Sequence, residues 1–284
     1  MSADSFRPTL TSAGSPRERT MAPDRSSSSS RMSARGEFAV APFLAPRDTE
    51  GVVSSATAAL LEPGSEAAEQ FRLLATRLRA RVAAHASAVV GVVSAAPGEG
   101  KTTVSIGLAH ALSLDSSLRV ALVDLDLRRP AVGRCLGLPN EDGVGEWLDG
   151  KVPGIGLLRP PNLGVNVAVA GTLGSSRFEL LGSPALARAL DAARRSFDFT
   201  VLDLPPLAPV ADGIVLQDVV DGFLLVVRSR HTPQEAIRAA VSDLRPDRIL
   251  GAVFNDHREL IPSYGSYARR RYSYDAGSGA RRYS

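Results

Sequence analysis

The feature that most constrains this chain is a glycine-rich stretch at residues 95–103, which reads AAPGEGKTT. A β-branched run over 88–94 precedes it, and a helical pattern over 103–114 follows it. A loop between a strand and a helix can present backbone N–H groups and the positive end of the helix to phosphate groups. The stretch therefore predicts a phosphate-binding P-loop.

Individual residues of this loop have distinct predicted roles. Lys101 is expected to reach the β and γ phosphates of a nucleotide, and the hydroxyl of Thr102 to bind Mg²⁺. Only two of the 33 basic residues are lysines, Lys101 and Lys151, and a compact ammonium suits this position. A chance glycine-rich turn is the alternative, which the acidic motifs below disfavour. The predicted nucleotide-binding positions in the loop are Gly98, Glu99, Gly100, Lys101, Thr102 and Thr103.

Three acidic residues lie at or just beyond the ends of predicted strands. Asp124 ends the apolar run 119–124, Asp126 lies two residues further on, and Asp203 lies in the run 200–204. Positions i and i+2 of a strand share a face, and open α/β sheets bind ligands at the carboxyl ends of their strands. We therefore expect the three carboxylates to face the P-loop, with Asp203 in the Walker B position. The predicted Mg²⁺ ligands are Thr102, Asp124 and Asp203.

Strand-like and helix-like segments alternate along most of the chain, which predicts an α/β P-loop NTPase fold with a mostly parallel sheet and helices on both faces. Ser65, Ser183 and Thr232 are predicted to open helices, the last two with proline at the first helical position. Beyond 88–94, the predicted strands are 119–124, 165–170, 200–204, 223–227 and 249–254. Beyond 103–114, the predicted helices are 66–84, 183–195 and 232–244.

Composition divides the chain into three regions. Residues 1–48 are rich in Ser, Arg and Pro, include a five-serine run, and are predicted to be a disordered low-complexity region. The apolar patch 38–46 shows no strand or helix pattern. Order is expected to begin near Glu62, and the nucleotide-binding domain to span 62–263. Residues 264–284 are predicted to form a disordered tail.

The tail holds every tyrosine of the chain. It also carries five arginines and one aspartate among Gly, Ser and Ala. Such a segment could bind nucleic acid or a membrane surface through charge and stacking, or it could expose phenols for modification. Because the basic charge sits in a short tail rather than on a folded face, no nucleic-acid partner is predicted. The tyrosines are Tyr264, Tyr267, Tyr272, Tyr274 and Tyr283.

Several other classes of protein are disfavoured by composition. No apolar run approaches the roughly 18 to 20 residues of a membrane span, and the N-terminus has no apolar segment of a secretory signal. The single cysteine, Cys135, supplies neither a disulfide framework nor a cluster site. We therefore expect a cytoplasmic protein.

Three motifs together resemble the bacterial tyrosine kinase family of capsule and exopolysaccharide biosynthesis. They are SAAPGEGKTT at 94–103, DLDLRRP at 124–130, and DLPP at 203–206 with Ala211-Asp212 beyond it. The resemblance covers the chain from about residue 62 onwards. It implies transfer of the γ-phosphate of ATP, with Mg²⁺, to tyrosines of the protein's own tail. The implied catalytic residues are Lys101, Asp124, Asp126 and Asp203.

The resemblance also assigns finer roles. One of the pair Asp124 and Asp126 helps to deprotonate the acceptor phenol, and we favour Asp126, since a phenol with a pKa near 10 needs such help. The five tail tyrosines are the phosphoacceptors. Asn255 lies where related P-loop proteins contact adenine, although an asparagine at a strand end is also a common turn residue.

Partners and assembly are implied in the same way. The family's Glu-x-x-Arg-x-x-Arg oligomerisation motif matches Glu69 and Arg72, but Ala75 takes the third position. Residues 175–181 keep a Glu-Leu-Leu sequence without the family's Pro-Asn-Pro lead-in. The implied partners are a homo-oligomer, a membrane-spanning polysaccharide co-polymerase adaptor and, further, a cognate tyrosine phosphatase. The implied location is cytoplasmic, at the inner membrane through the adaptor.

Other functions of the same fold remain as alternatives. A partition or septum-site ATPase switch would carry a second P-loop lysine at the position of Ala96, and a nitrogenase-reductase-like protein would need cluster cysteines. A nucleotide-binding regulator of polysaccharide export that has lost kinase activity is the third alternative.

Overall fold

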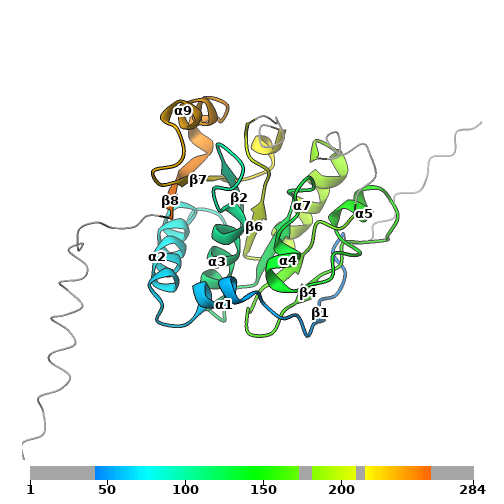
Figure 1. The fold of residues 1–284 in the computed structure, drawn as a ribbon. Helices are drawn as coiled ribbons and strands as arrows, with labels where there is room; N and C mark the ends of the chain where they lie inside the picture. Colours follow the sequence, from blue (N-terminus) through cyan, green and yellow to red (C-terminus); the bar gives the residue numbers. More distant parts are fainter. Residues whose placement is uncertain (1–41, 173–180, 209–214, 257–284) are drawn as a thin grey trace, which may run out of the picture. The chain divides into compact units, whose positions relative to one another are not determined.

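An eight-stranded sheet organises the part of the chain that the computed structural model describes, residues 42–172, 181–208 and 215–256 (Figure 1). The strand order is β1-β4-β5-β3-β6-β2-β7-β8, and every pair is parallel except β4 with β5. The predicted mostly parallel α/β sheet is confirmed. The strands are β1 Arg47–Asp48, β2 Ala88–Ser94, β3 Val120–Asp124, β4 Leu158–Arg159, β5 Asn166–Ala168, β6 Phe199–Asp203, β7 Gly222–Arg228 and β8 Ile249–Asn255.

Helices cover both faces of the sheet, as predicted. One apolar cluster joins α2, α3 and α4 to one face, and a second joins α5, α7 and α9 to the other. Both clusters draw on the fully buried strand β2, whose alternate residues point to opposite faces. The helices are α1 Ser55–Leu61, α2 Glu66–Arg81, α3 Lys101–Ser113, α4 Val132–Leu136, α5 Val144–Leu148, α7 Pro184–Ser196 and α9 Gln234–Ser242, with short 3₁₀ turns at Leu216–Asp218 and Pro246–Arg248.

Side-chain caps begin two of the predicted helices. The Ser65 hydroxyl accepts a hydrogen bond from the Ala68 N–H at 3.0 Å at the start of α2. At the start of α7, the Ser183 hydroxyl accepts a hydrogen bond from the Leu186 N–H at 3.3 Å. The predicted cap at Thr232 is wrong. Pro233 takes the N-cap position of α9, and the Thr232 side chain is engaged elsewhere, with the P-loop.

The folded region begins earlier than predicted. Residues 42–48 were assigned to the disordered region, and order was expected only from Glu62, yet the structure describes residues 42–61. Phe43 bridges Ile155 and packs edge-on against Phe197, with ring centres 5.9 Å apart, and β1 pairs with β4. These tertiary contacts order a segment that has no periodicity of its own.

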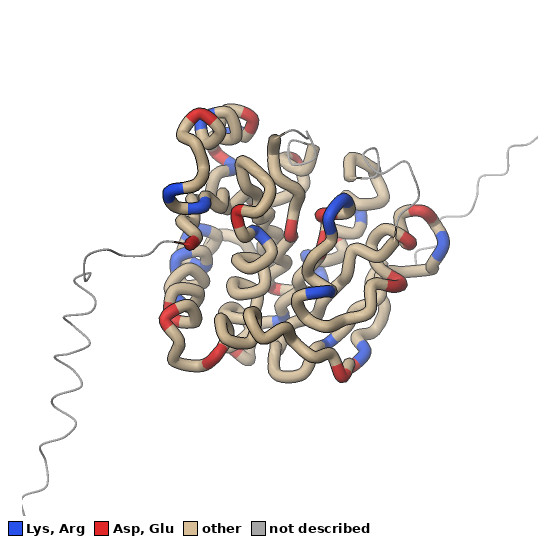
Figure 2. The backbone as a smooth tube through the Cα atoms, in the orientation of Figure 1, with Lys and Arg blue, Asp and Glu red and all other residues tan. Residues whose placement is uncertain are grey.

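Charged residues are nearly absent from the long strands. In β2, β3, β6, β7 and β8 the charged side chains are Asp124, Asp203 and Arg228, and each is the last residue of its strand. Figure 2 shows the remaining charges mostly along helices and connecting loops. The five long strands therefore place their charged side chains at the carboxyl edge of the sheet, where the P-loop also lies.

No helix within the described residues is long and apolar enough to cross a membrane. The five tail tyrosines, the low-complexity residues 1–41, Ala211-Asp212 and most of the Glu-Leu-Leu segment lie outside the described residues, so their predictions stay predictions.

Candidate active site

The P-loop links β2 to α3 through two glycines with left-handed backbone. Gly98 has φ of 79° and Gly100 has φ of 91°, values that side-chain-bearing residues rarely adopt. A Cβ on Gly100 would lie only 2.0 Å from Nδ2 of Asn255. The loop ends directly in α3, whose first residue is Lys101, so the helix N-terminus and the lysine occupy the place that the sequence predicts for phosphate binding.

Asp203 is anchored to the first turns of α3. Its Oδ2 accepts a hydrogen bond from Thr102 Oγ1 at 2.6 Å, and its Oδ1 accepts one from Ser105 Oγ at 3.1 Å. The sequence predicted that Thr102 and Asp203 lie at the same Mg²⁺ site, but not their direct hydrogen bond, and it gave no role to Ser105. The available signal was its spacing, because residues three apart in a helix share a face.

Asp124 lies beside Asp203, since the two residues are register partners on the neighbouring strands β3 and β6. Three backbone N–H groups hold its carboxylate: Asp126 donates to Oδ1 at 3.1 Å, and Ala131 and Val132 donate to Oδ2 at 3.1 and 3.0 Å. The turn that follows β3 therefore wraps around Asp124 and fixes its orientation.

Burial gives this acidic pair unusual electrostatics. Both side chains are fully buried. Burial, and then the charge of Asp203, raise the pKa of Asp124 above its usual range. Burial also raises the pKa of Asp203, although the Thr102 hydrogen bond and the Lys101 charge oppose the shift. Two adjacent buried carboxylates that form no direct ion pair resist ionisation, and perturbed groups of this kind are typical of functional sites.

Asp126 lies at the border of the site. It is 9% exposed, and its Oδ1 accepts a hydrogen bond from the Arg129 N–H at 3.0 Å. The structure thus brings Lys101, Thr102, Asp124 and Asp203 together, with Asp126 next to them and closer to the surface. That position fits the group predicted to meet an incoming phenol.

The oxygen donors here fit Mg²⁺ bound together with a nucleotide. Thr102, Asp124 and Asp203 offer a hydroxyl and two carboxylates. Among the described residues no cluster of three or more His, Cys, Asp or Glu side chains is arranged to hold a metal alone. Mg²⁺ usually takes one or two carboxylates and completes its shell with phosphates and water, so this donor set matches a metal that arrives with its nucleotide.

Two predicted nucleotide-binding residues make contacts inside the protein. Glu99 is 3% exposed, and its carboxylate bonds the Ala95 N–H and Thr232. Asn255 Nδ2 donates to the Glu99 carbonyl at 2.9 Å. The Glu99 side chain is therefore not free to reach a ligand in this conformation, whereas the adenine contact of the half-buried Asn255 stays a prediction. The predicted nucleotide contact of Glu99 is therefore restricted to its backbone.

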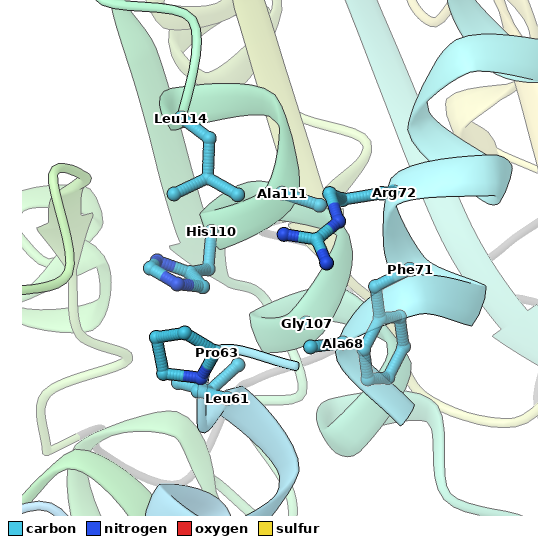
Figure 3. Close-up of a pocket in the computed structure, with 9 residues that line it drawn as sticks. All are labelled: Leu61, Pro63, Ala68, Phe71, Arg72, Gly107, His110, Ala111 and Leu114. Atoms are coloured by element: carbon cyan, nitrogen blue, oxygen red, sulfur yellow. The ribbon is translucent and has the colours of Figure 1, made fainter. Parts of the chain in front are cut away.

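The predicted oligomerisation pair lies on α2. Glu69 and Arg72 form an ion pair with each other, and Ala75, at the third motif position, is buried in the domain's own core. Arg72 and Phe71 line a small pocket between α2 and α3, together with His110 (Figure 3). Gly107 lets the two helices approach here, because a Cβ would lie 2.4 Å from the Phe71 ring.

Comparison with known proteins identifies the family. Residues 90–260 match the model of the CobQ/CobB/MinD/ParA nucleotide binding domain. The tyrosine-protein kinase YwqD of Bacillus subtilis is 31% identical over 216 residues, which cover 75% of this chain and 91% of that kinase. The chain belongs to the bacterial tyrosine kinase family. Its P-loop domain is accordingly a nucleotide-binding domain.

Two further proteins resemble this chain. The succinoglycan biosynthesis transport protein ExoP of Rhizobium meliloti is 32% identical over 70% of this chain, and the chain spans only 26% of its length. The solved kinase domain of the Escherichia coli tyrosine kinase ETK superposes with a TM-score of 0.68 at 27% identity, covering 76% of this chain and 86% of that domain.

Proposed function

We propose that this chain is an ATP-dependent protein-tyrosine autokinase that regulates the polymerisation and export of a capsule or exopolysaccharide. The observation that carries the proposal is the junction of Lys101 and Thr102 with the paired carboxylates Asp124 and Asp203 at one sheet edge. The same chain keeps all of its tyrosines within its last 21 residues. A phosphate-binding site and a cluster of tyrosine hydroxyls in the same chain support the proposal that the protein phosphorylates its own tail.

The roles of the residues follow from their positions. Bound Mg²⁺ would neutralise phosphate charge, held by Thr102, Asp203 and Asp124. Lys101 and the N-terminus of α3 would stabilise negative charge on the transferring group. Asp126, the most exposed of the three acids, would accept the proton of the tyrosine hydroxyl. The acceptors would be Tyr264, Tyr267, Tyr272, Tyr274 and Tyr283.

The proposed partners follow from the family. Relatives include separate kinases, such as YwqD, and longer proteins, such as ExoP, of which this domain is only a part. We propose that a membrane-spanning adaptor of the polysaccharide machinery activates this domain and holds it at the inner membrane. Self-association through Glu69 and Arg72 and reversal by a tyrosine phosphatase belong to the same proposal. Equal turnover with and without an adaptor's cytoplasmic segment would argue against activation.

Phosphotyrosine mapping tests the proposal. Purified protein is incubated with ATP and Mg²⁺, and modified residues are located by mass spectrometry. We expect phosphate on tail tyrosines, and none without Mg²⁺. ATP hydrolysis without phosphotyrosine, with the adaptor segment present, would favour the alternative of an ATPase regulator that is not a kinase.

A further inference from the structure

The side chain of Glu99 is buried in a loop whose other tip residues, Pro97 and Gly98, are exposed. Its Oε2 accepts a hydrogen bond from the Ala95 N–H at 3.0 Å, across the base of the loop. Its Oε1 accepts a hydrogen bond from Thr232 Oγ1, 133 residues away in sequence. Both carboxylate oxygens are thus bonded inside the protein, so the negative charge of Glu99 is not presented to a phosphate group that it would repel.

Thr232 lies in the connection between β7 and α9 and joins two elements. Its Oγ1 accepts a hydrogen bond from the Arg228 N–H at 3.0 Å, at the end of β7, and donates to Glu99. A second tie runs from the end of the next strand, where Asn255 donates to the Glu99 carbonyl. The tip of the P-loop is therefore held by β7 and β8, the two strands beyond β2 in the sheet.

We propose that Thr232 is a positioning residue, which holds the P-loop in its phosphate-binding conformation through Glu99. Without the hydroxyl, Oε1 would be buried without this donor, which is unfavourable for a charged group. The carboxylate would then turn to solvent and release the Ala95 N–H. A fraction of molecules would lose the binding-competent loop, and the apparent dissociation constant would rise in inverse proportion to the competent fraction.

The proposal predicts a specific division between binding and rate. Bound nucleotide selects the competent loop, so the rate at saturating ATP should change little while the KM for ATP rises. The contact between Thr232 and Glu99 also couples nucleotide binding to the connection between β7 and α9. When the P-loop binds a nucleotide, Glu99 would hold Thr232, and with it that connection, in place. The inference rests on the nucleotide-binding part of the proposed function and does not require that the acceptor be a tyrosine.

Binding of ADP with Mg²⁺ to the full-length protein, measured by calorimetry, tests the contact. Thr232→Val keeps the shape of the side chain and removes the hydroxyl, and we expect the Kd to rise about fivefold to twentyfold. Thr232→Ser keeps the hydroxyl and should stay within about twofold of wild type. The matched control is Thr76→Val on α2, whose hydroxyl bonds the Arg72 carbonyl at 2.9 Å, and its Kd should not change.

A double-mutant cycle with Glu99→Ala separates this role from a general loss of packing. If Thr232 acts through Glu99, Thr232→Val should have little further effect on the Kd in the Glu99→Ala background. The proposal is overturned if Thr232→Val binds ADP like wild type, if Thr232→Ser fails to rescue binding, or if the effect of Thr232→Val persists undiminished without Glu99. ADP binding needs no phosphotransfer. If no phosphotyrosine forms, the kinase proposal is contradicted, but the ADP-binding test of Thr232 is still valid.

Discussion

At the carboxyl edge of the sheet Asp124 and Asp203 are fully buried, and in the described part of the chain neither forms an ion pair with arginine or lysine. At the opposite edge two acids each pair with an arginine. Asp221, 9% exposed, pairs with Arg194 and accepts the Val89 N–H at 2.7 Å, and Asp198 pairs with Arg119 at 3.2 Å. An unpaired buried charge is costly. The first edge therefore gives up stability at the place where we propose that Mg²⁺ binds, and the second edge uses charge to hold the fold.

The largest expected effect lies at the carboxyl edge. Lys101→Met removes the charge that we propose contacts the phosphates, and it should slow autophosphorylation by at least about a thousandfold while leaving the circular dichroism spectrum unchanged. The other lysine is the control, since Lys151 is an exposed partner of Asp149. Lys151→Met should label like wild type. If the Lys101→Met protein is phosphorylated at the wild-type rate, the assignment of this active site is wrong.

The opposite edge should respond in stability rather than in rate. Arg194→Met leaves Asp221 buried without its main cation and should lower the free energy of unfolding by about 2 to 3 kcal/mol in urea titrations. Arg195→Met, at the exposed neighbouring position on α7, serves as the control and should cost less than about 0.5 kcal/mol. If folded Arg194→Met binds ADP more weakly while its stability is unchanged, this edge serves nucleotide binding rather than stability, and the comparison between the two edges is wrong.

One substitution made at both edges should change stability in opposite directions. Asp203→Asn removes an unpaired buried charge, while the Thr102 and Ser105 hydroxyls can still bond the amide, so the nucleotide-free protein should gain about 1 kcal/mol at pH 8. Asp198→Asn loses its ion pair and should cost up to about 1 kcal/mol. Thermal unfolding without Mg²⁺ or nucleotide measures both. If the unfolding temperatures of both variants move in the same direction, the proposed difference between the two edges is wrong.

An effect of similar size to the last concerns pH. The raised pKa of Asp203 means that, above about pH 4, the folded protein keeps a proton that the unfolded chain has released. The folded state then binds more protons, so this contribution to stability is lost as pH rises through the folded pKa. Wild type should therefore lose roughly 1 kcal/mol more than Asp203→Asn between pH 5 and pH 8 without Mg²⁺. Parallel pH profiles for the two proteins would exclude the effect.

The long elements could be predicted because their patterns are local. The continuous apolar run of β2 was predicted at its observed bounds, and the Ser65 cap marked the start of α2. The five-residue helices α4 and α5 and the two-residue strands β1 and β4 were missed. Segments this short complete too few periods to show in a sequence.

The residues of the site also fall into those that the sequence could predict and those that it could not. The P-loop and the acids were predictable because their chemistry repeats fixed spacings along the chain. Ser105 and Thr232 were missed because their partners, Asp203 and Glu99, lie 98 and 133 residues away. Only the parallel order of β2, β6 and β7 brings these residues together.

Tail phosphorylation by two matched aspartate variants tests whether the carboxyl edge of the sheet is the catalytic one. Asp203→Asn and Asp198→Asn are incubated with ATP and Mg²⁺ at a temperature where both are folded, and phosphotyrosine is quantified by mass spectrometry. The account predicts that Asp198→Asn labels the tail like wild type, although it is the less stable protein. Asp203→Asn should lose at least about a hundredfold in rate, although it is the more stable one. Equal labelling by Asp203→Asn would contradict the claim that this edge of the sheet is built for catalysis.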